Sequence, residues 1–454
     1  MTKIFSHSVR LEGADASNVG GVGDSAGVAN VAGATSTTDA AIACTTPNLD
    51  IVDAFCVLQK GFTDQFVYYD KERPNRYMGL GRCIAIRSLE SADIVLQGDP
   101  DYPPIFCSFN RFDEPNPNPP DAMMASFPKV HLMVPEVVLI ENEAGSFLQV
   151  NSLGPVYKGR IDRFVRHVRE AKPRTHRSMT YSLERDSFED WQKVMEIGLS
   201  RIRSHRIDKL VPSRRIYLKT EEPFSSKDVL ANLIDGDARG CVFMYRYGDV
   251  FFCGCTPELL VRKQGTSVER MWVAGTTLCG ANEDERTKRA NDLLHDDKNR
   301  REHEFVVQFM REVFGRNCYN VDIPCEPSIK VLRHIQHLCT PVSAQVMEGR
   351  SLLSLASQLH PTPALSGTPG VGEAMMTLRE AELYNRGFFG GAVGYVDGAG
   401  NGEFSVAIRS GVFDGEAGWL YAGCGIVEGS DAREEFDEID LKLQTILSAF
   451  TAPE

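Results

Sequence analysis

The most regular alternation of apolar and polar positions lies at residues 388–447. Three runs rich in β-branched, aromatic and glycine residues are separated by two clusters that contain Asp-Gly and Asn-Gly pairs. Such pairs suit the tight turns of β-hairpins. The pattern therefore predicts strands over 388–396, 403–412 and 419–427.

A helix is predicted after Ser430 and Asp431, two residue types that favour the N-cap. Glu435 and Glu438 lie three residues apart on its first turns, so their carboxylates are neighbours that repel unless a cation lies between them. An acidic first turn that complements the helix dipole, with Lys442 paired to Glu438, is the simpler interpretation, and a cation site is the alternative. The apolar stripe of this helix comprises Phe436, Ile439, Leu443, Ile446, Leu447 and Phe450.

Upstream, strand patterns outnumber helical ones and mostly follow one another directly. This order favours an α+β fold with antiparallel sheets over alternating βαβ units. The predicted helices cover 186–204, 227–234, 297–314, 351–359 and 372–384. The predicted strands include 66–69, 77–86, 130–140, 147–150, 209–217, 241–247, 250–254 and 328–333.

The first part of the chain has a different composition. Residues 13–48 are a mixture of Gly, Ala, Ser, Thr and Val without a periodic apolar face. We therefore expect 1–48 to be a disordered, low-complexity extension, followed by a single domain over 50–454.

Charge and cysteine content narrow the class of protein. The net charge of −13 argues against nucleic acid or an anionic membrane as the main partner. No apolar run reaches the roughly 18–20 residues of a membrane span, and the N-terminus lacks the apolar region of a secretory signal. Twelve cysteines in 454 residues do not form a disulfide framework, so a cytoplasmic location is expected.

Several charged residues occupy defined local positions. Lys209 opens a predicted strand, Glu258 follows a Thr-Pro pair, and Glu302 precedes the apolar face of a helix. Arg409 lies in the alternating run EFSVAIRS. Each also has an ordinary structural interpretation, and spacing alone does not join them into one site.

Motifs across the chain connect these residues. The chain resembles the chorismate-utilising enzymes, and among them most closely the isochorismate synthases, strongly over 186–450 and more weakly over 50–185. The motifs that carry the resemblance are TPELLVRK at 256–263, VAGTT at 273–277, NRREHEFV at 299–306, HLCTP at 337–341, LHPTPALSGTP at 359–369, NRGFFGGAVGYVD at 385–397, GEFSVAIRS at 402–410, YAGCGIVEGSD at 421–431 and FDEIDLKL at 436–443.

The resemblance implies an anthranilate synthase component I-like fold, with two packed antiparallel sheets and outer helices. It implies that chorismate is converted to isochorismate. Lys209 would activate water for attack at ring C2, and Glu258 would protonate the departing C4 hydroxyl. Mg²⁺ would be held by Glu302 and Glu438, with Glu435 near the ion or holding one of its waters.

The resemblance also implies the substrate contacts. Arg409 would bind a substrate carboxylate, and the remaining contacts would come from backbone amides and polar or aromatic side chains. The residues implied are Gly275, Thr276, His337, Thr340, Phe389, Gly423 and Gly425.

Residues at key positions distinguish the reactions of the family. Lys209 favours water over the ammonia used by anthranilate synthases, which typically carry Gln there, so no glutamine amidotransferase subunit is expected. Ala274 disfavours aminodeoxychorismate synthesis. The alternatives are a salicylate synthase, which typically has Tyr at the position of Phe389, and a catalytically silent family member. A monomer or homodimer is compatible with the resemblance, as is menaquinone or siderophore biosynthesis.

Three departures from the family pattern stand near the proposed site. Pro212 removes a backbone donor from the predicted strand 209–217 and predicts an edge or a bulge. Thr277 and Leu278 replace a pair that is often basic, and Asn299 stands where an acid is frequent.

Overall fold

The computed structural model describes residues 4–12, 44–45, 50–110, 121–331 and 335–453. Its larger sheet comprises β1 Phe5–Glu12, β2 Cys44–Thr45, β3 Asp64–Asp70, β4 Arg76–Leu80, β8 Val137–Asn142, β9 Gly145–Ser152, β10 Tyr181–Glu184, β12 Ser213–Thr220, β13 Cys241–Tyr247, β14 Val250–Thr256, β23 Ser410–Asp414 and β24 Ala417–Gly423. The twelve strands are ordered β10-β12-β24-β23-β14-β13-β3-β4-β8-β9-β1-β2.

The second sheet comprises β5 Ile84–Ile86, β6 Ile105–Phe109, β7 Val130–Val134, β15 Leu259–Gln264, β16 Ser267–Leu278, β17 Cys318–Asp322, β18 Ser328–Val331, β19 Ile335–Val346, β21 Ala392–Val396 and β22 Gly402–Val406. Its order is β17-β19-β16-β15-β22-β21-β6-β7-β5, with β18 also paired to β19. A separate two-stranded sheet joins β11 Lys209–Leu210 to β20 Gly367–Thr368.

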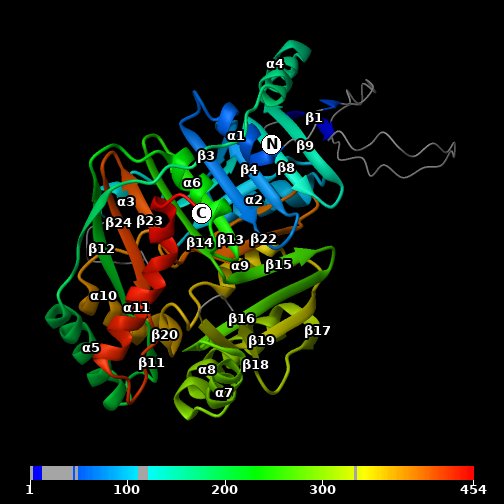
Figure 1. The fold of residues 1–454 in the computed structure, drawn as a ribbon. Helices are drawn as coiled ribbons and strands as arrows, with labels where there is room; N and C mark the ends of the chain where they lie inside the picture. Colours follow the sequence, from blue (N-terminus) through cyan, green and yellow to red (C-terminus); the bar gives the residue numbers. More distant parts are fainter. Residues whose placement is uncertain (1–3, 13–43, 46–49, 111–120, 332–334, 454) are drawn as a thin grey trace.

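The helices lie mainly at the outside of the two sheets (Figure 1). They are α1 Ile51–Leu58, α2 Leu89–Gly98, α3 Ala122–Ala125, α4 Lys158–Arg169, α5 Phe188–Arg203, α6 Ser226–Asp235, α7 Glu283–Leu294, α8 Asp297–Asn317, α9 Leu352–Leu359, α10 Met375–Glu382 and α11 Ala432–Leu447, with a π-helical turn at Gly370–Ala374 and a 3₁₀ turn at Ser448–Phe450. Helix α5 packs on α10 and α11, whereas α7 and α8 cover β16 and β19.

Aromatic side chains fill the space between the two sheets. The rings of Phe66 on β3 and Phe106 on β6 have centroids 4.5 Å apart, and those of Tyr68 on β3 and Tyr395 on β21 are 5.4 Å apart. Burial of such large apolar surfaces is a main source of stability. The predicted α+β fold with two packed antiparallel sheets is confirmed.

The prediction of one continuous strand over 403–412 is wrong, because the chain forms two strands there. The chain forms β22 in the second sheet, crosses to the larger sheet at residues 407–409, and continues as β23. Nearly every side chain from 402 to 412 is buried, so the sequence pattern does not reveal the crossing. Arg409 at the crossing has φ +53, which is uncommon for a residue other than glycine, so it does not lie within a strand as predicted.

Proline divides two other predicted strands. The predicted strand 130–140 is split by Pro135 into β7 and β8, which belong to different sheets. The predicted strand 209–217 is split at Val211 and Pro212 into β11 and β12. An edge or a bulge was predicted at Pro212, but the structure has a break between two strands there, because proline cannot donate to a strand ladder.

The predicted N-terminal extension also needs a correction. Residues Phe5–Glu12 are not disordered but form β1, which pairs antiparallel with β9. Val9 and Leu11 are buried while Arg10 between them is exposed, as the period of a strand requires. The rest of the predicted extension, except Ile4 and Cys44–Thr45, lies outside the described residues.

Two further features concern the described part of the chain. Its cysteine side chains, which lie mostly in the interior, form no disulfide. No helix among the described residues is long and apolar enough to cross a bilayer.

Candidate functional site

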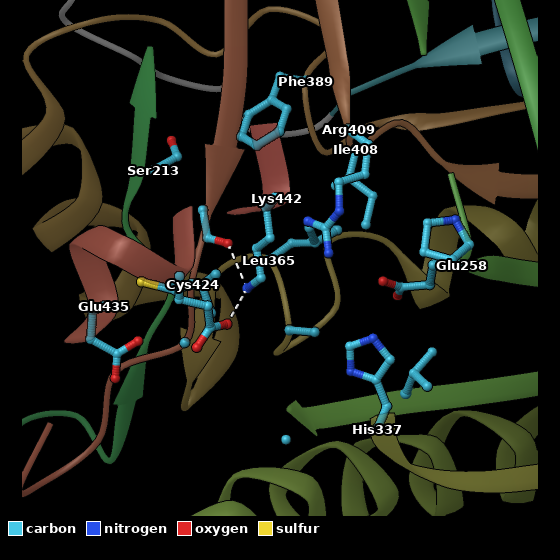
Figure 2. A pocket seen from close by; sticks show the side chains of 18 of the residues that line it. Ser213, Glu258, His337, Leu365, Phe389, Ile408, Arg409, Cys424, Glu435 and Lys442 are labelled. Atoms are coloured by element: carbon cyan, nitrogen blue, oxygen red, sulfur yellow. Dashed lines mark hydrogen bonds and ion pairs between the residues drawn. The ribbon is translucent and has the colours of Figure 1, made fainter. Parts of the chain in front are cut away.

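A cavity opens where the two crossings between the sheets meet the N-terminal turns of α8 and α11 (Figure 2). It contains about 970 Å³ of empty space, a figure that includes the open solvent at its mouth. The polar and charged side chains that line it are Ser213, Glu258, Lys298, Asn299, His337, Arg386, Arg409, Glu435, Glu438 and Lys442.

Glu258 lies at the first crossing between the sheets. It follows β14 of the larger sheet and precedes β15 of the second, and its carbonyl accepts a hydrogen bond from the Val406 backbone N–H at 3.0 Å. Val406 ends the strand before the second crossing, which carries Arg409. The two crossings are therefore tied together, and each delivers one charged side chain to the cavity.

Glu258 is buried, and burial raises the pKa of its carboxyl group. The positive charges of Arg270, Arg409, Lys209 and Lys442 lower the pKa but do not cancel the effect of burial. The protonated form is therefore favoured relative to a carboxyl group in water.

Lys209 is fully buried on β11. Lys209 is not one of the described residues that line the cavity, but Val211, two residues further along the chain, is. The charge of Lys209 lowers the pKa of Glu258. β11 is held by β20, and a Cβ atom added to Gly367 on β20 would lie 2.3 Å from the Lys209 carbonyl oxygen. The glycine of the motif HPTPALSGTP is thus what allows the loop to approach Lys209.

Arg409 stands between two acidic regions of the cavity (Figure 2). Burial lowers the pKa of its guanidinium to about 10, although the charges of Glu438 and Glu258 act in the opposite direction. Arg409 is therefore still a cation at neutral pH, and it faces space that an anion could fill.

The helix α11 begins at Asp431, whose side chain accepts hydrogen bonds from the backbone N–H groups of Arg433 and Glu434 at 2.8 and 3.1 Å. This confirms the predicted N-terminus of the helix. The cap orients the first turns so that both Glu435 and Glu438 line the cavity.

The two carboxylates of α11 have opposite pKa shifts. Burial and the neighbouring charge of Glu438 raise the pKa of Glu435, although Lys298 Nζ lies 3.0 Å from Glu435 Oε1. Burial is the largest effect on the pKa of Glu438 and raises it. The ammonium of Lys442, 2.5 Å from Glu438 Oε1, together with the charges of Arg409 and Lys298, outweighs burial and brings the pKa below its ordinary value. The ion pair of Glu438 and Lys442 expected from their spacing is present.

The donor chemistry of this pair fits a hard divalent cation. Glu435 and Glu438 offer carboxylate oxygens to one cavity. The pKa of Glu435 is raised first by burial and then by repulsion from Glu438, and a cation between the two would relieve that repulsion. Among the described side chains, no three His, Cys, Asp or Glu residues converge as a complete metal site. Glu302, the third predicted ligand, lies on α8, and its side chain lies outside what the structure describes.

His337 on β19 lies opposite Arg409 in the cavity wall. Burial, together with the charges of Arg409 and Lys442, lowers the pKa of its imidazole to about 3, so the ring is neutral at physiological pH. Its neighbour Gly275 has φ +78, a conformation that favours glycine, and packs against the Asn299 side chain. A neutral imidazole can donate one hydrogen bond and accept another.

The remaining predicted residues lie as follows. Phe389 forms part of the wall, stacked on Tyr421 with ring centroids 5.3 Å apart. Gly423 and Gly425 line the cavity, whereas Thr340 is not among the lining residues and bonds with its Oγ1 to Nε2 of His303 at 2.7 Å. Thr276 lies on β16, and its side chain is not described.

Sequence reasoning missed several lining residues. Lys298 was overlooked, although it directly precedes the motif NRREHEFV in the first turn of α8. Leu365 and Arg386 lie within the motifs at 359–369 and 385–397 but were not singled out as site residues, and Ser213 lies in no quoted motif. Arg386 donates hydrogen bonds to the carbonyls of Leu365 and Val211, at 2.7 and 2.6 Å, so packing brings these segments to the cavity.

Comparison with known proteins gives a family. A family model described as chorismate binding enzyme matches residues 29–451. The chain is 37% identical over 261 residues to isochorismate synthase MenF of Bacillus subtilis, covering 58% of this chain and 55% of that protein. It is 34% identical over 264 residues to the salicylate biosynthesis isochorismate synthase of Pseudomonas aeruginosa, covering 58% and 55%. The chain thus spans about half the length of these two relatives.

Solved structures share the fold at low sequence identity. The menaquinone-specific isochorismate synthase MenF of Escherichia coli superposes with a TM-score of 0.77 at 20% identity, covering 99% of this chain and 95% of that one. Anthranilate synthase component I of Streptococcus pneumoniae gives a TM-score of 0.66 at 19% identity, covering 86% and 91%.

Proposed function

Because the chain belongs to the chorismate-binding enzyme family, we propose that it is an isochorismate synthase that uses Mg²⁺ and converts chorismate to isochorismate. The main support for this proposal is that Glu258 lies on one side of a single cavity, Glu435 and Glu438 lie on another side, and Arg409 lies between them. Chorismate is a dicarboxylate, and cationic side chains in and beside this cavity offset the negative charge of the whole chain.

In this reaction Lys209 is the general base, which takes a proton from the water that attacks ring C2. Glu258 donates a proton to the C4 hydroxyl, which leaves as water while both ring double bonds move by one position. Burial of Glu258 supports its role, because a raised pKa favours the proton-carrying form that a general acid needs. Arg409 binds a carboxylate of the substrate and orients the ring.

Glu435 and Glu438, with Glu302 as the third residue, are the groups that would hold Mg²⁺. When bound, Mg²⁺ supplies positive charge that neutralises a ring carboxylate of the substrate. His337, as a neutral imidazole, donates or accepts a hydrogen bond at the wall of the cavity without adding charge.

The test is incubation of the purified protein with chorismate, with and without Mg²⁺, followed by mass-resolved chromatography. Isochorismate without pyruvate supports the proposal. Salicylate with stoichiometric pyruvate identifies a salicylate synthase instead. Absence of any product from folded protein contradicts both and indicates a silent family member.

Two substitutions test the roles of the acid and the base. Lys209→Ala and Glu258→Gln should each lower kcat by about 10²-fold or more while Mg²⁺ binding, measured by calorimetry, persists. A kcat that stays near that of the unchanged protein after either substitution would remove that residue from the mechanism.

A further inference from the structure

Each carboxylate at the start of α11 is paired with a lysine ammonium. Lys298 Nζ, from α8, lies 3.0 Å from Glu435 Oε1, and Lys442 Nζ, one turn along α11, lies 2.5 Å from Glu438 Oε1. All four residues line the same cavity. Without a bound cation, these lysines supply the positive charge that the carboxylates need.

The ammonium of Lys442 has a second partner inside the cavity. It donates a hydrogen bond to the Gly423 carbonyl at 3.0 Å, and both of its interactions are drawn in Figure 2. The two acceptors, Glu438 and Gly423, both line the cavity. Lys442 is therefore held at the cavity wall by groups that a ligand could reach.

A divalent cation on Glu438 would compete directly with this ammonium. Both seek the same carboxylate oxygen, and a cation between Glu435 and Glu438 would repel a lysine that stayed beside it. The lysine side chain is a flexible four-carbon stem that can move its charge by several ångströms without backbone motion. The open space beside Arg409 offers such a destination.

We propose that Lys442 is a displaceable counter-ion, which neutralises Glu438 in the metal-free protein and, when a divalent cation binds, swings into the cavity to bind an anionic group of the substrate. This inference rests on the proposed function for the identity of the cation and the substrate. It adds a coupling: cation binding would create part of the substrate site, and the substrate would strengthen cation binding in return.

The experiment is calorimetric titration of the full chain with Mg²⁺ alone, in the absence of substrate. Lys442→Gln removes the competing charge and should bind Mg²⁺ about tenfold more tightly than the unchanged protein, because a charged hydrogen bond no longer has to be broken. Lys442→Arg keeps the charge and should bind Mg²⁺ like the unchanged protein. In steady-state kinetics with saturating Mg²⁺, Lys442→Gln should also show a KM for chorismate raised by about tenfold.

A matched control uses a lysine outside the cavity. Lys193 pairs with Asp190 at 2.7 Å on the exposed face of α5, and Lys193→Gln should leave Mg²⁺ affinity unchanged. Circular dichroism and thermal melting of all variants establish that each is folded before its affinity is compared.

Mg²⁺ affinity that is unchanged or weaker in folded Lys442→Gln overturns the inference, since Lys442 would then be a fixed partner or a support of the metal site. The inference is also overturned if neither the unchanged protein nor Lys442→Gln binds Mg²⁺. The product assay separates this from the proposed function. If the unchanged protein forms isochorismate but Lys442→Gln does not bind Mg²⁺ more tightly, only the displacement of Lys442 by the cation is rejected. If Lys442→Gln binds Mg²⁺ more tightly but the unchanged protein forms no isochorismate, the displacement is supported and only the proposed reaction is rejected.

Discussion

The guanidinium Nη2 of Arg270 lies 3.7 Å from Oε1 of Glu258, and both side chains are buried. Arg270 projects from β16 of the second sheet toward the crossing that carries Glu258. Burial lowers the pKa of Arg270 to about 10, although the charge of Glu258 acts in the opposite direction. In turn, among the charges that lower the pKa of Glu258, that of Arg270 has the largest effect. The proton affinity of Glu258 therefore depends on a residue outside the cavity wall.

Arg270→Met should move the pH dependence of the reaction. The other charges that act on Glu258, from Arg409, Lys209 and Lys442, remain, but loss of Arg270 raises the pKa of Glu258 further. A general acid works in its protonated form, so activity is lost as pH rises through its pKa. The alkaline limb of kcat/KM against pH should therefore shift to higher pH, and Arg270→Lys should shift it less. An alkaline limb that stays in place would separate Arg270 from the acid.

Because β20 lies so close to β11, Gly367 on β20 should not tolerate a larger side chain. Gly367→Ala would place a methyl group 2.3 Å from the Lys209 carbonyl oxygen, so the two strands must separate. We expect a loss of about 1–3 kcal/mol in the free energy of unfolding, as for other overpacked sites, and a fall in kcat because Lys209 moves. Gly372→Ala is the matched control, because Gly372 has a similar φ of +155 but nothing within 4 Å of the added atom. Equal effects of the two substitutions would attribute the loss to backbone strain alone.

Glu258→Gln preserves the shape of the side chain and removes its proton. If Glu258 is the general acid, kcat should fall by about 10²–10⁴-fold. The KM for chorismate should change far less, because the rest of the cavity wall is intact. A comparable fall in substrate affinity with kcat preserved would instead assign Glu258 to binding.

Arg409→Met removes the cation between the acidic regions of the cavity. Loss of one charged hydrogen bond to a substrate carboxylate should raise the KM for chorismate by about 10- to 100-fold. The substitution should also raise the pKa of His337, since Arg409 contributes to lowering it, and the imidazole NMR signals should report this. Arg311→Met on the exposed side of α8 is the control, because its pairing with Glu304 lies at the surface. An unchanged KM in Arg409→Met would exclude a carboxylate contact.

Local sequence determined the local structure well. The Asp-Gly and Asn-Gly turns produced the hairpins β21–β22 and β23–β24, and Asp431 started α11 where its side chain could cap the backbone. These features depend on neighbouring residues alone, so the sequence contains all the information they need. Ordered motifs across the chain further indicated the family that the comparisons established.

Only the tertiary structure decided where the strands belong and which charges meet. Nearly every side chain in the run 403–412 is buried, so nothing in its pattern marks the point at which the chain changes sheet and Arg409 enters the cavity. In the same way, the pairing of Lys442 with Glu438 was readable from an i,i+4 spacing, but its burial in the cavity was not. Arg270 on β16 and Glu258, which lies between β14 and β15, come within 3.7 Å through the pairing of β15 with β16, and neither residue gave a sign of this partner in the sequence pattern. The spacing of apolar residues shows which side of a helix or strand is buried. It does not show which other helix or strand packs against that side, because this depends on contacts between segments distant in the chain.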